Sequence, residues 1–490
     1  GGYRLASTLM GLTLLIPIVG AIGVIFVNSS RVRKFAGGVA LVTTLLTVWL
    51  AVLQYGNAPI EAAWPWISGL GIDFEFHLDG LSTILMVAAA LLTAAAILFM
   101  PHEVRGQEIE CGSFYGWMLV FLAAMIGVAL AANTVQFYLF WEALLIPSTA
   151  MLAFWGDNER RGKIALKYFV YTHVGAVLIL IALLWVYTTK GVTDIYAFRE
   201  VLADVDPSIL RMLIWLFILG FGFKLAMFPF HSWLPDTYEA SPLPLAIAMA
   251  GGMMGCGIYG IIRFVYTPFP QEIIAELSIP VMTLALITLY YGGIMAFAQK
   301  NLRRFLAYSS MSQMGYVLFG IGSAHGLGVG GATFHILNHG VAKALMFMVV
   351  AVLIYRTGKN SLDELGGLAT KMPITALCAT VGAFSLAGAP PFSGFHSEWM
   401  IFAGVYSAGN LVLAALAIAG AVLSSAYALG FVRYAFFGHP KESFEEVKEV
   451  PFKILAPMLV LALVAVVVGV YPAPFFQWVT GALGPLYLGI

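Results

Sequence analysis

The chain has 490 residues and a formal net charge of zero, so its charge gives no indication of nucleic-acid binding. Hydrophobic residues make up 61% of the sequence, charged residues only 10%, and the mean hydropathy is +0.91. Soluble domains carry about a quarter charged residues. The composition therefore excludes a water-soluble globular protein and predicts an all-α polytopic membrane protein.

Stretches of about 20 apolar residues predict fourteen membrane spans. The first follows "GGYRLAST" without a small-residue cleavage site, so we expect a span and not a removable signal. Two spans are interrupted by Pro and Gly, the seventh at "FGFKLAMFPFHSWLPD" and the twelfth at "FSLAGAPPFSGFHSEWMIF", which predicts broken helices. The spans start near residues 8, 35, 80, 114, 134, 164, 210, 243, 276, 304, 328, 373, 409 and 454.

The distribution of Lys and Arg supports this count. Of the 25 such residues, 17 fall in alternate connections beginning with the loop after span one, five fall on the other side, and three lie within spans. Cytoplasmic loops are enriched in Lys and Arg. We therefore expect both termini on the outer side of a plasma membrane or an equivalent energy-coupling membrane.

The five-span blocks 114–266 and 276–437 look like repeats, because each has its broken helix as the fourth member. An odd number of spans inverts the second copy relative to the first, and inverted repeats with broken helices build midplane sites in many transporters. The predicted organisation is a three-helix segment at 1–110, repeats at 111–270 and 271–437, and an amphipathic loop with a final helix at 438–490.

Placing an ionisable side chain at the membrane centre costs roughly 2.5–3.5 kcal/mol of insertion free energy, so each such residue indicates a structural or functional role. Glu142 lies in the middle of span five, and Lys224 lies just before the break in span seven. Glu142 is either a protonated carboxyl bound to a neighbouring helix or a carboxylate that exchanges a proton. Lys224 either forms a structural ion pair with Glu142 or loads and releases a proton.

Span eleven contains His335, His339 and Lys343 at four-residue intervals, flanked by Asn338. Residues four apart share a helix face, so the three groups form a stripe about 12 Å long. Such a row, with water between its members, is suited to proton transfer. A structural role stays open, as does zinc binding by the two histidines, although the lysine would repel the metal.

Further ionisable residues surround the breaks. Glu398 follows the second break and either ends the polar row or binds a neighbouring helix. Two acids occupy the inner loop after span seven, which has no Lys or Arg, so they are either solvated or gather cations at an entrance. The weaker candidates are Lys167, His173, His231, Asp236, Glu239 and His396.

No sequence motif indicates a bound cofactor, a metal centre or a catalytic residue. Cys111, Cys256 and Cys378 are far apart and lack paired spacing, so neither disulfides nor an iron–sulfur or zinc site is supported. No phosphate-binding GxxxxGK[ST] loop is present, and no GxGxxG follows a predicted strand.

Six motifs, in order, resemble one known family over about residues 75–440. They are "FYLFWEALLIPS", "FGFKLAMFPFHSWLPDTYEASP", "QKNLRRFLAYSSMSQMGY", "HILNHGVAKALMF", "DELGGLATKMP" and "SLAGAPPFSGFHSEW". The chain resembles the antiporter-like subunits: the proton-pumping subunits of respiratory complex I, the membrane-arm subunits of membrane-bound hydrogenases and sulfane reductases, and the large subunits of Mrp-type sodium/proton antiporters.

The resemblance implies fourteen helices in two inverted five-helix repeats. It implies a Glu–Lys pair at Glu142 and Lys224, and a hydrophilic axis that ends in an acid or lysine after the second break. It also implies membrane-subunit partners and no cofactor in this chain, with any iron–sulfur redox chemistry in a peripheral arm. The axis residues are His335, His339, Lys343 and Glu398.

Two departures from the family pattern stand out. Span eight lacks the usual lysine or histidine, whose expected position falls near Met249 or Gly255, and Gln313 stands where a histidine is common. Either water bridges this gap, or the two half-channels are not joined, or the chain moves ions poorly.

The sequence therefore predicts a non-catalytic subunit that translocates protons, or exchanges sodium for protons, within a redox-driven or Mrp-type complex. The alternative is a structural spacer of the same complex that has lost conduction at span eight. A single-chain transporter of organic solutes is disfavoured, since the axis offers little aromatic or hydrogen-bonding lining for such a substrate.

Overall fold

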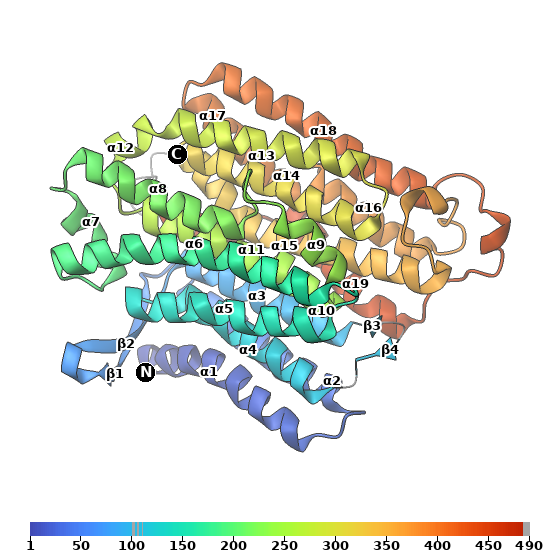
Figure 1. Cartoon of the computed structure of the whole chain (residues 1–490), viewed down its shortest axis with the longest axis horizontal. Coiled ribbons are helices and arrows are strands. Elements are labelled where there is room, and N and C mark those ends of the chain that lie inside the picture. The colour runs from blue at the N-terminus through green and yellow to red at the C-terminus, as the bar shows by residue number, and fades with distance from the viewer. Residues whose placement is uncertain (100–102, 105–106, 110, 484–490) are drawn as a thin grey trace.

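The computed structural model describes residues 1–99, 103–104, 107–109 and 111–483, and most of them are helical. Figure 1 shows an elongated bundle in which α1 lies along one edge, α18 along the opposite edge and α15 in the middle. The β1–β2 hairpin, α7 and α12 lie at one end of the bundle, whereas β3 and β4 lie towards the other (Figure 1). Successive connections therefore alternate between the two ends, as a chain that crosses a membrane repeatedly requires.

The N-terminal half of the chain contains three leading helices, two short hairpins and the first five-span block. Side-chain caps fix several helix starts: Asn133 accepts a hydrogen bond from Gln136 N at 2.8 Å at the start of α5. The elements are α1 Gly2–Gly23, α2 Val32–Gln54, β1 Ile60–Ile67, β2 Ile72–Leu78, α3 Gly80–Leu98, β3 Glu103–Val104, β4 Gln107–Glu108, α4 Gly112–Leu130, α5 Thr134–Trp155, α6 Arg161–Lys190, α7 Phe198–Leu202, α8 Pro207–Lys224, α9 Trp233–Ala240, α10 Leu243–Ala248, the π-helical η4 Met249–Met253, α11 Met254–Ile261 and the π-helical η5 Ile262–Tyr266.

The C-terminal half contains the second five-span block and two final helices. Its longest element, α15, has 32 residues and begins where His325 accepts a hydrogen bond from Leu327 N. The elements are α12 Gln271–Glu276, α13 Ser278–Ala298, α14 Leu302–Gly322, α15 Gly326–Thr357, α16 Pro373–Leu386, α17 Gly394–Ser407, α18 Leu411–Phe436, α19 Phe452–Val470 and α20 Ala473–Leu483.

The predicted membrane architecture is confirmed. Within the described residues, twelve helical segments are long and apolar enough to cross a membrane. Two further predicted spans correspond to α14, which has 21 residues, and to α16, an apolar helix of 14 residues that ends at the second break. Together these make the fourteen spans expected. Arg303, Arg304 and Gln313 make α14 more polar than the others, which fits a helix that is buried in protein.

The predicted break in span seven lies between α8 and α9. Helical geometry ends at Lys224 and resumes at Trp233, and Ala226 has φ = 56°, a left-handed value that is uncommon for a residue with a side chain. The indole N–H of Trp233 donates to the carbonyl of Phe223 at 3.0 Å. Side chains thus satisfy backbone groups that the broken helix leaves without partners.

The predicted break in span twelve has the same character. Helix α16 ends at Leu386, α17 begins at Gly394, and Gly388 between them has φ = 76°, a conformation that favours glycine. The N–H of Gly394 donates to Ser385 Oγ at 3.1 Å. Both spans are therefore broken at the Pro/Gly segments identified in the sequence, whereas the proposed repeat and domain boundaries stay a prediction.

A buried ion pair ties α3 to the helical segment of span eight. The Arg263 guanidinium donates to both carboxylate oxygens of Asp79 at 2.7 Å, and both side chains are buried. Burial alone would raise the pKa of Asp79, but the charge and hydrogen bonds of Arg263 lower that pKa to about 2. A depressed carboxyl pKa adds stability above its ordinary value of about 3.9, and this stability is lost as the pH falls through that range towards 2.

Asp79→Asn should destabilise the protein by about 3–5 kcal/mol, because it leaves the Arg263 charge buried without a counter-charge. Thermal unfolding of the purified protein at neutral pH measures this as a lower midpoint. Asp73→Asn, at an exposed position on β2, is the matched control and should leave the midpoint unchanged. Equal midpoints for the two variants would contradict this role for the pair.

Candidate ion-translocation site

The polar row expected on span eleven lies at the centre of the bundle. His335, His339 and Lys343 on α15 are at most 2% exposed, and the two imidazole rings are 5.8 Å apart between centroids. Almost all of the α15 window that could cross the membrane is buried inside the protein. The three groups therefore face neighbouring helices, and their hydrogen bonds must come from those helices.

His335 is held from both sides. Its Nδ1 is 2.7 Å from Ser397 Oγ on α17, and its Nε2 is 3.0 Å from Gln313 Oε1 on α14. The amide nitrogen of Gln313 donates in turn to Tyr427 OH at 3.1 Å and to the carbonyl of Leu386 at 3.3 Å, beside the second break. Both ring nitrogens of His335 are thus engaged by side chains, which argues against the zinc alternative.

The two later members of the row, His339 and Lys343, are hydrogen-bonded to α14. His339 Nε2 lies 3.5 Å from Ser310 Oγ, and Lys343 donates to Ser309 Oγ and, at 3.3 Å, to the carbonyl of Leu306. Hydroxyl and carbonyl oxygens therefore surround the ammonium group. No Asp or Glu oxygen among the described residues lies within 4.0 Å of Lys343 Nζ.

Glu398 is buried beside the second break. Its side chain is 5% exposed, and its Oε1 has no hydrogen-bond partner among the described residues. Its Oε2 packs against Gly388, so closely that a Cβ at that glycine would lie 1.6 Å from the oxygen. The left-handed glycine thus makes room for the carboxyl. Ser397, the residue before Glu398, hydrogen-bonds His335, although no hydrogen bond among the described residues joins Glu398 itself to the row.

The expected ion pair between Glu142 and Lys224 is not formed. Glu142 Oε2 lies 3.4 Å from His173 Nδ1 on α6, and its Oε1 has no hydrogen-bond partner among the described residues. The Lys224 ammonium lies instead over the ring of Trp141, 4.5 Å from its centroid. The reason is geometric: Trp141 and Glu142 are adjacent on α5 and point in different directions, one towards α8 and the other towards α6.

The two acids after span seven are bound to cations. Asp236 lies 3.3 Å from Lys167 Nζ and 3.0 Å from Arg304 Nη1, which also reaches Glu239 at 2.9 Å. These groups, from α6, α9 and α14, form one network that joins the two blocks. The acids are therefore not simply solvated, as one reading of the sequence proposed.

The two histidines beside the breaks have separate surroundings. The ring of His231 stacks on Phe228 at 5.4 Å and lies 4.6 Å from the ring of Tyr291. His396 Nε2 is 2.7 Å from the carbonyl of Gly469 on α19. Within the described part of the chain, no hydrogen bond or ring contact joins either histidine to His335, His339 or Lys343.

Sequence reasoning missed several polar residues that complete these surroundings. Span ten contains polar residues at three- and four-residue spacing, which is the signal that could have shown it facing the row. It also missed the role of Arg263, which was counted as a loop cation but forms the buried pair with Asp79. The polar residues of span ten that were missed in this way are Ser309, Ser310 and Gln313.

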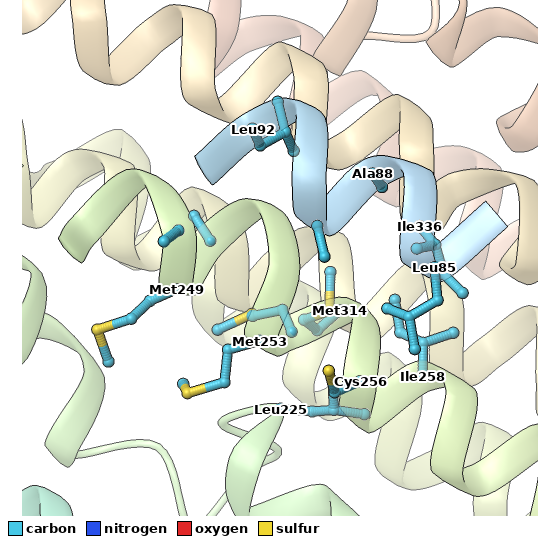
Figure 2. Close-up of a cluster of buried hydrophobic side chains, with 14 of the residues drawn as sticks. Leu85, Ala88, Leu92, Leu225, Met249, Met253, Cys256, Ile258, Met314 and Ile336 are labelled. Carbon is cyan, nitrogen blue, oxygen red and sulfur yellow. The ribbon is translucent and has the colours of Figure 1, made fainter. Parts of the chain in front are cut away.

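An apolar layer surrounds span eight, which contacts both α8 of the first block and α15 of the second. Figure 2 shows Met249, Met253 and Cys256 of span eight alongside the α3 helix that carries Leu85 and Leu92, with Leu225, Met314 and Ile336 beside them. All of these side chains are buried. A Cβ on Gly255 would lie 3.0 Å from Ile336 and 3.1 Å from Leu85, so this position is filled by neighbours. Span eight therefore offers no charged side chain between the Lys224 region and the row.

A family described as NADH:quinone oxidoreductase/Mrp antiporter, TM, matches residues 131–424, which include both breaks, Glu142, Lys224 and the polar row. The chain belongs to this family. This confirms the antiporter-like resemblance that the six motifs indicated.

Relatives in this family match over nearly the whole chain. Subunit M of the F(420)H(2) dehydrogenase of Methanosarcina mazei is 32% identical over 480 residues, covering 94% of each chain. A chain of respiratory complex I from Thermus thermophilus is 27% identical with a TM-score of 0.86, covering 98% of this chain and 99% of that one. A chain of an archaeal membrane-bound sulfane sulfur reductase is 30% identical with a TM-score of 0.84, covering 94% and 76%.

Gly388→Ala should displace Glu398 and destabilise the protein by about 1–3 kcal/mol, because alanine is strained at positive φ and its Cβ would collide with Oε2. Thermal unfolding and ion transport are the measurements. Gly430→Ala on α18 is the matched control, since nothing lies within 4 Å of a Cβ there. If both variants unfold and transport alike, the fit between Gly388 and Glu398 is unimportant.

Proposed function

We propose that this chain translocates protons as one subunit of a multi-subunit membrane complex. The proposed path uses Glu142 and Lys224 in the first block and a row in the second block that ends at Glu398. The row itself consists of His335, His339 and Lys343. Lys167, His173, His231, Asp236, Glu239 and His396 are secondary candidates near the path.

The observation that carries this proposal is the buried row on α15. Three ionisable groups within 2% exposure occupy one helix in the centre of a membrane protein, where each costs roughly 2.5–3.5 kcal/mol. Their partners are neutral hydroxyls, a side-chain amide and a backbone carbonyl, which can accept or donate without trapping a charge. A purely structural role would be served better by apolar packing or by a matched ion pair.

The first block supplies groups that suit proton loading. The Lys224 ammonium has an aromatic face as its neighbour, while Oε1 of Glu142 has no hydrogen-bond partner among the described residues. A cation over an aromatic ring is stabilised by roughly 2 kcal/mol or more when both are desolvated, which is modest enough for the lysine to leave. The pair can therefore exist apart, as seen here, and can close when Lys224 moves towards Glu142.

Lys224→Ala should abolish proton translocation through this subunit while the complex still assembles. The measurement is the pH gradient formed by membrane vesicles that contain the intact complex, with subunit content checked on the same preparation. Lys190→Ala, which breaks only a surface pair with Asp204, is the control and should pump normally. Normal pumping by the Lys224 variant would end the proposal.

A structural spacer is the second candidate, and the apolar layer at span eight favours it. Methionine, leucine and isoleucine side chains cannot relay protons, and span eight packs against Leu225, next to Lys224, and against Ile336, next to His335. A spacer would keep the charges as helix contacts while partner subunits carry the ions.

Glu142→Gln distinguishes the two candidates. The amide keeps the shape of the side chain but cannot bind and release a proton. A translocating subunit should lose pumping in this variant, whereas a spacer should leave the transport of the whole complex intact. Vesicle pumping per turnover of the complex is the quantity to compare.

The wider setting follows from the same proposal. We infer an energy-coupling membrane with both termini outside, partner subunits in the membrane, and a redox arm with iron–sulfur centres if the complex is redox-driven. Sodium exchange is the variant of the proposal in which the carboxylates also bind Na⁺. In either variant, the two five-helix repeats at 111–270 and 271–437 each hold one half of the path. The proposal assigns no cofactor to this chain.

A further inference from the structure

The apolar layer raises the question of how a proton could pass from the first block to the second. The broken helix α9 lies between α6 of the first block and α14 of the second, and the Asp236–Arg304 ion pair joins it to α14. It offers a route beside span eight that does not cross the layer. Three hydroxyl groups lie along this route, on α6, α9 and α14: Tyr168, Tyr238 and Ser310.

Tyr168 forms the first-block end of the route. It is fully buried, and its hydroxyl is 2.7 Å from Ser148 Oγ and 3.3 Å from Met253 Sδ. Met253 and Cys256 are three residues apart and therefore share a face of span eight about one turn apart. Lys224 interacts electrostatically with Cys256. The Tyr168 hydroxyl and the Lys224 ammonium thus border the same face of this helix.

Tyr238 lies in the middle of the route. Its side chain is fully buried, and its hydroxyl has no hydrogen-bond partner among the described residues. Its ring packs edge-on against Phe347 of α15 at 5.4 Å, and its backbone carbonyl accepts from Arg303 at 2.9 Å. The ring is therefore held in place. A buried hydroxyl without a hydrogen-bond partner lowers the stability of the folded protein by about 1–3 kcal/mol.

The groups that face the Tyr238 hydroxyl belong to both blocks. Tyr168 interacts electrostatically with it and Ser310 lies within reach of a side-chain hydrogen bond, although the Tyr238 hydroxyl makes no well-aligned hydrogen bond among the described residues. Ser310 Oγ in turn lies 3.5 Å from His339 Nε2. Side-chain rotation, or water in the gaps, would join the three hydroxyls into one chain that ends on the polar row.

We propose that Tyr168, Tyr238 and Ser310 form a hydroxyl relay that carries protons around the apolar layer, from the Lys224 region to His339. Tyr168 and Tyr238 each accept a proton on the hydroxyl oxygen and release their own to the next hydroxyl, and Ser310 releases its own to Nε2 of His339, so no charge remains on the relay. The ammonium of Lys224 loses the proton, and the imidazole of His339 gains it. This inference rests on the proposed translocating function. In it, neutral hydroxyl groups take the place of the lysine or histidine that span eight lacks.

The experiment compares Tyr238→Phe, Tyr168→Phe and the double variant in vesicles that contain the intact complex. Phenylalanine keeps both rings and removes only the hydroxyl. We expect each single variant to lose as much proton pumping per turnover as Lys224→Ala, and the double variant to lose no more, because the hydroxyls act in series. Tyr115→Phe, which loses a buried hydroxyl on α4 that bonds the carbonyl of Ile109, should pump normally.

Ser310 provides a test that a merely structural hydroxyl would not pass. Ser310→Thr keeps the hydroxyl and should retain pumping, whereas Ser310→Ala should lose it. If Tyr238→Phe fails to assemble, the Ser310 pair decides the question in the assembled complex.

The outcomes separate the two proposals. Full pumping by the tyrosine and Ser310→Ala variants, together with loss in Lys224→Ala, would overturn the relay and leave the translocating function standing. Full pumping by Lys224→Ala would overturn the function itself. Additive losses in the double tyrosine variant would also overturn the relay, because they indicate two independent structural roles.

Discussion

Hydrocarbon offers no hydrogen-bond partners, so every polar group inside the bundle must find its partner within the protein. This constraint explains why α14 is the most polar of the central helices. Its hydroxyls and its one side-chain amide face α15 and bind His335, His339 and Lys343. Neutral partners of this kind satisfy the row without fixing its charge state, which a carboxylate at the same place would do.

The two broken helices answer the same constraint at other points. Each break frees backbone groups in the membrane interior, and side chains close by accept or donate to them: Trp233 at the first break and Ser385 at the second. The breaks also place ionisable groups where a continuous helix would not. Lys224 ends α8 directly before the first break, and Glu398 packs against the left-handed Gly388 in the second.

At span eight, the need to give every buried polar group a hydrogen-bond partner conflicts with the need for groups that transfer protons. A charge there would link the two blocks but would also need a partner in a span whose membrane-crossing window is entirely buried inside the protein. This chain fills the position with Met253, Cys256 and their neighbours, which pack without polar cost (Figure 2). Neutral hydroxyls beside the layer, on α6, α9 and α14, are a cheaper way to cross between the blocks because they need no counter-charge.

The sequence determined the membrane class, the number of spans, the two breaks and the position of the polar row. These follow from local rules: apolar length, the missing hydrogen bonds at Pro and Gly, and the four-residue repeat of a helix face. All three act within one helix or its immediate neighbours in the chain, so no knowledge of packing is needed to apply them.

Only the tertiary structure decided which side chains meet across helices. The sequence paired Glu142 with Lys224, but the helix rotations turn the acid to His173 and the amine to Trp141. Likewise, Gln313 is a departure from a family pattern in the sequence, whereas the fold makes it the residue that binds His335. Such pairings depend on the rotation and depth of two separate helices. No spacing along a single chain encodes that relation.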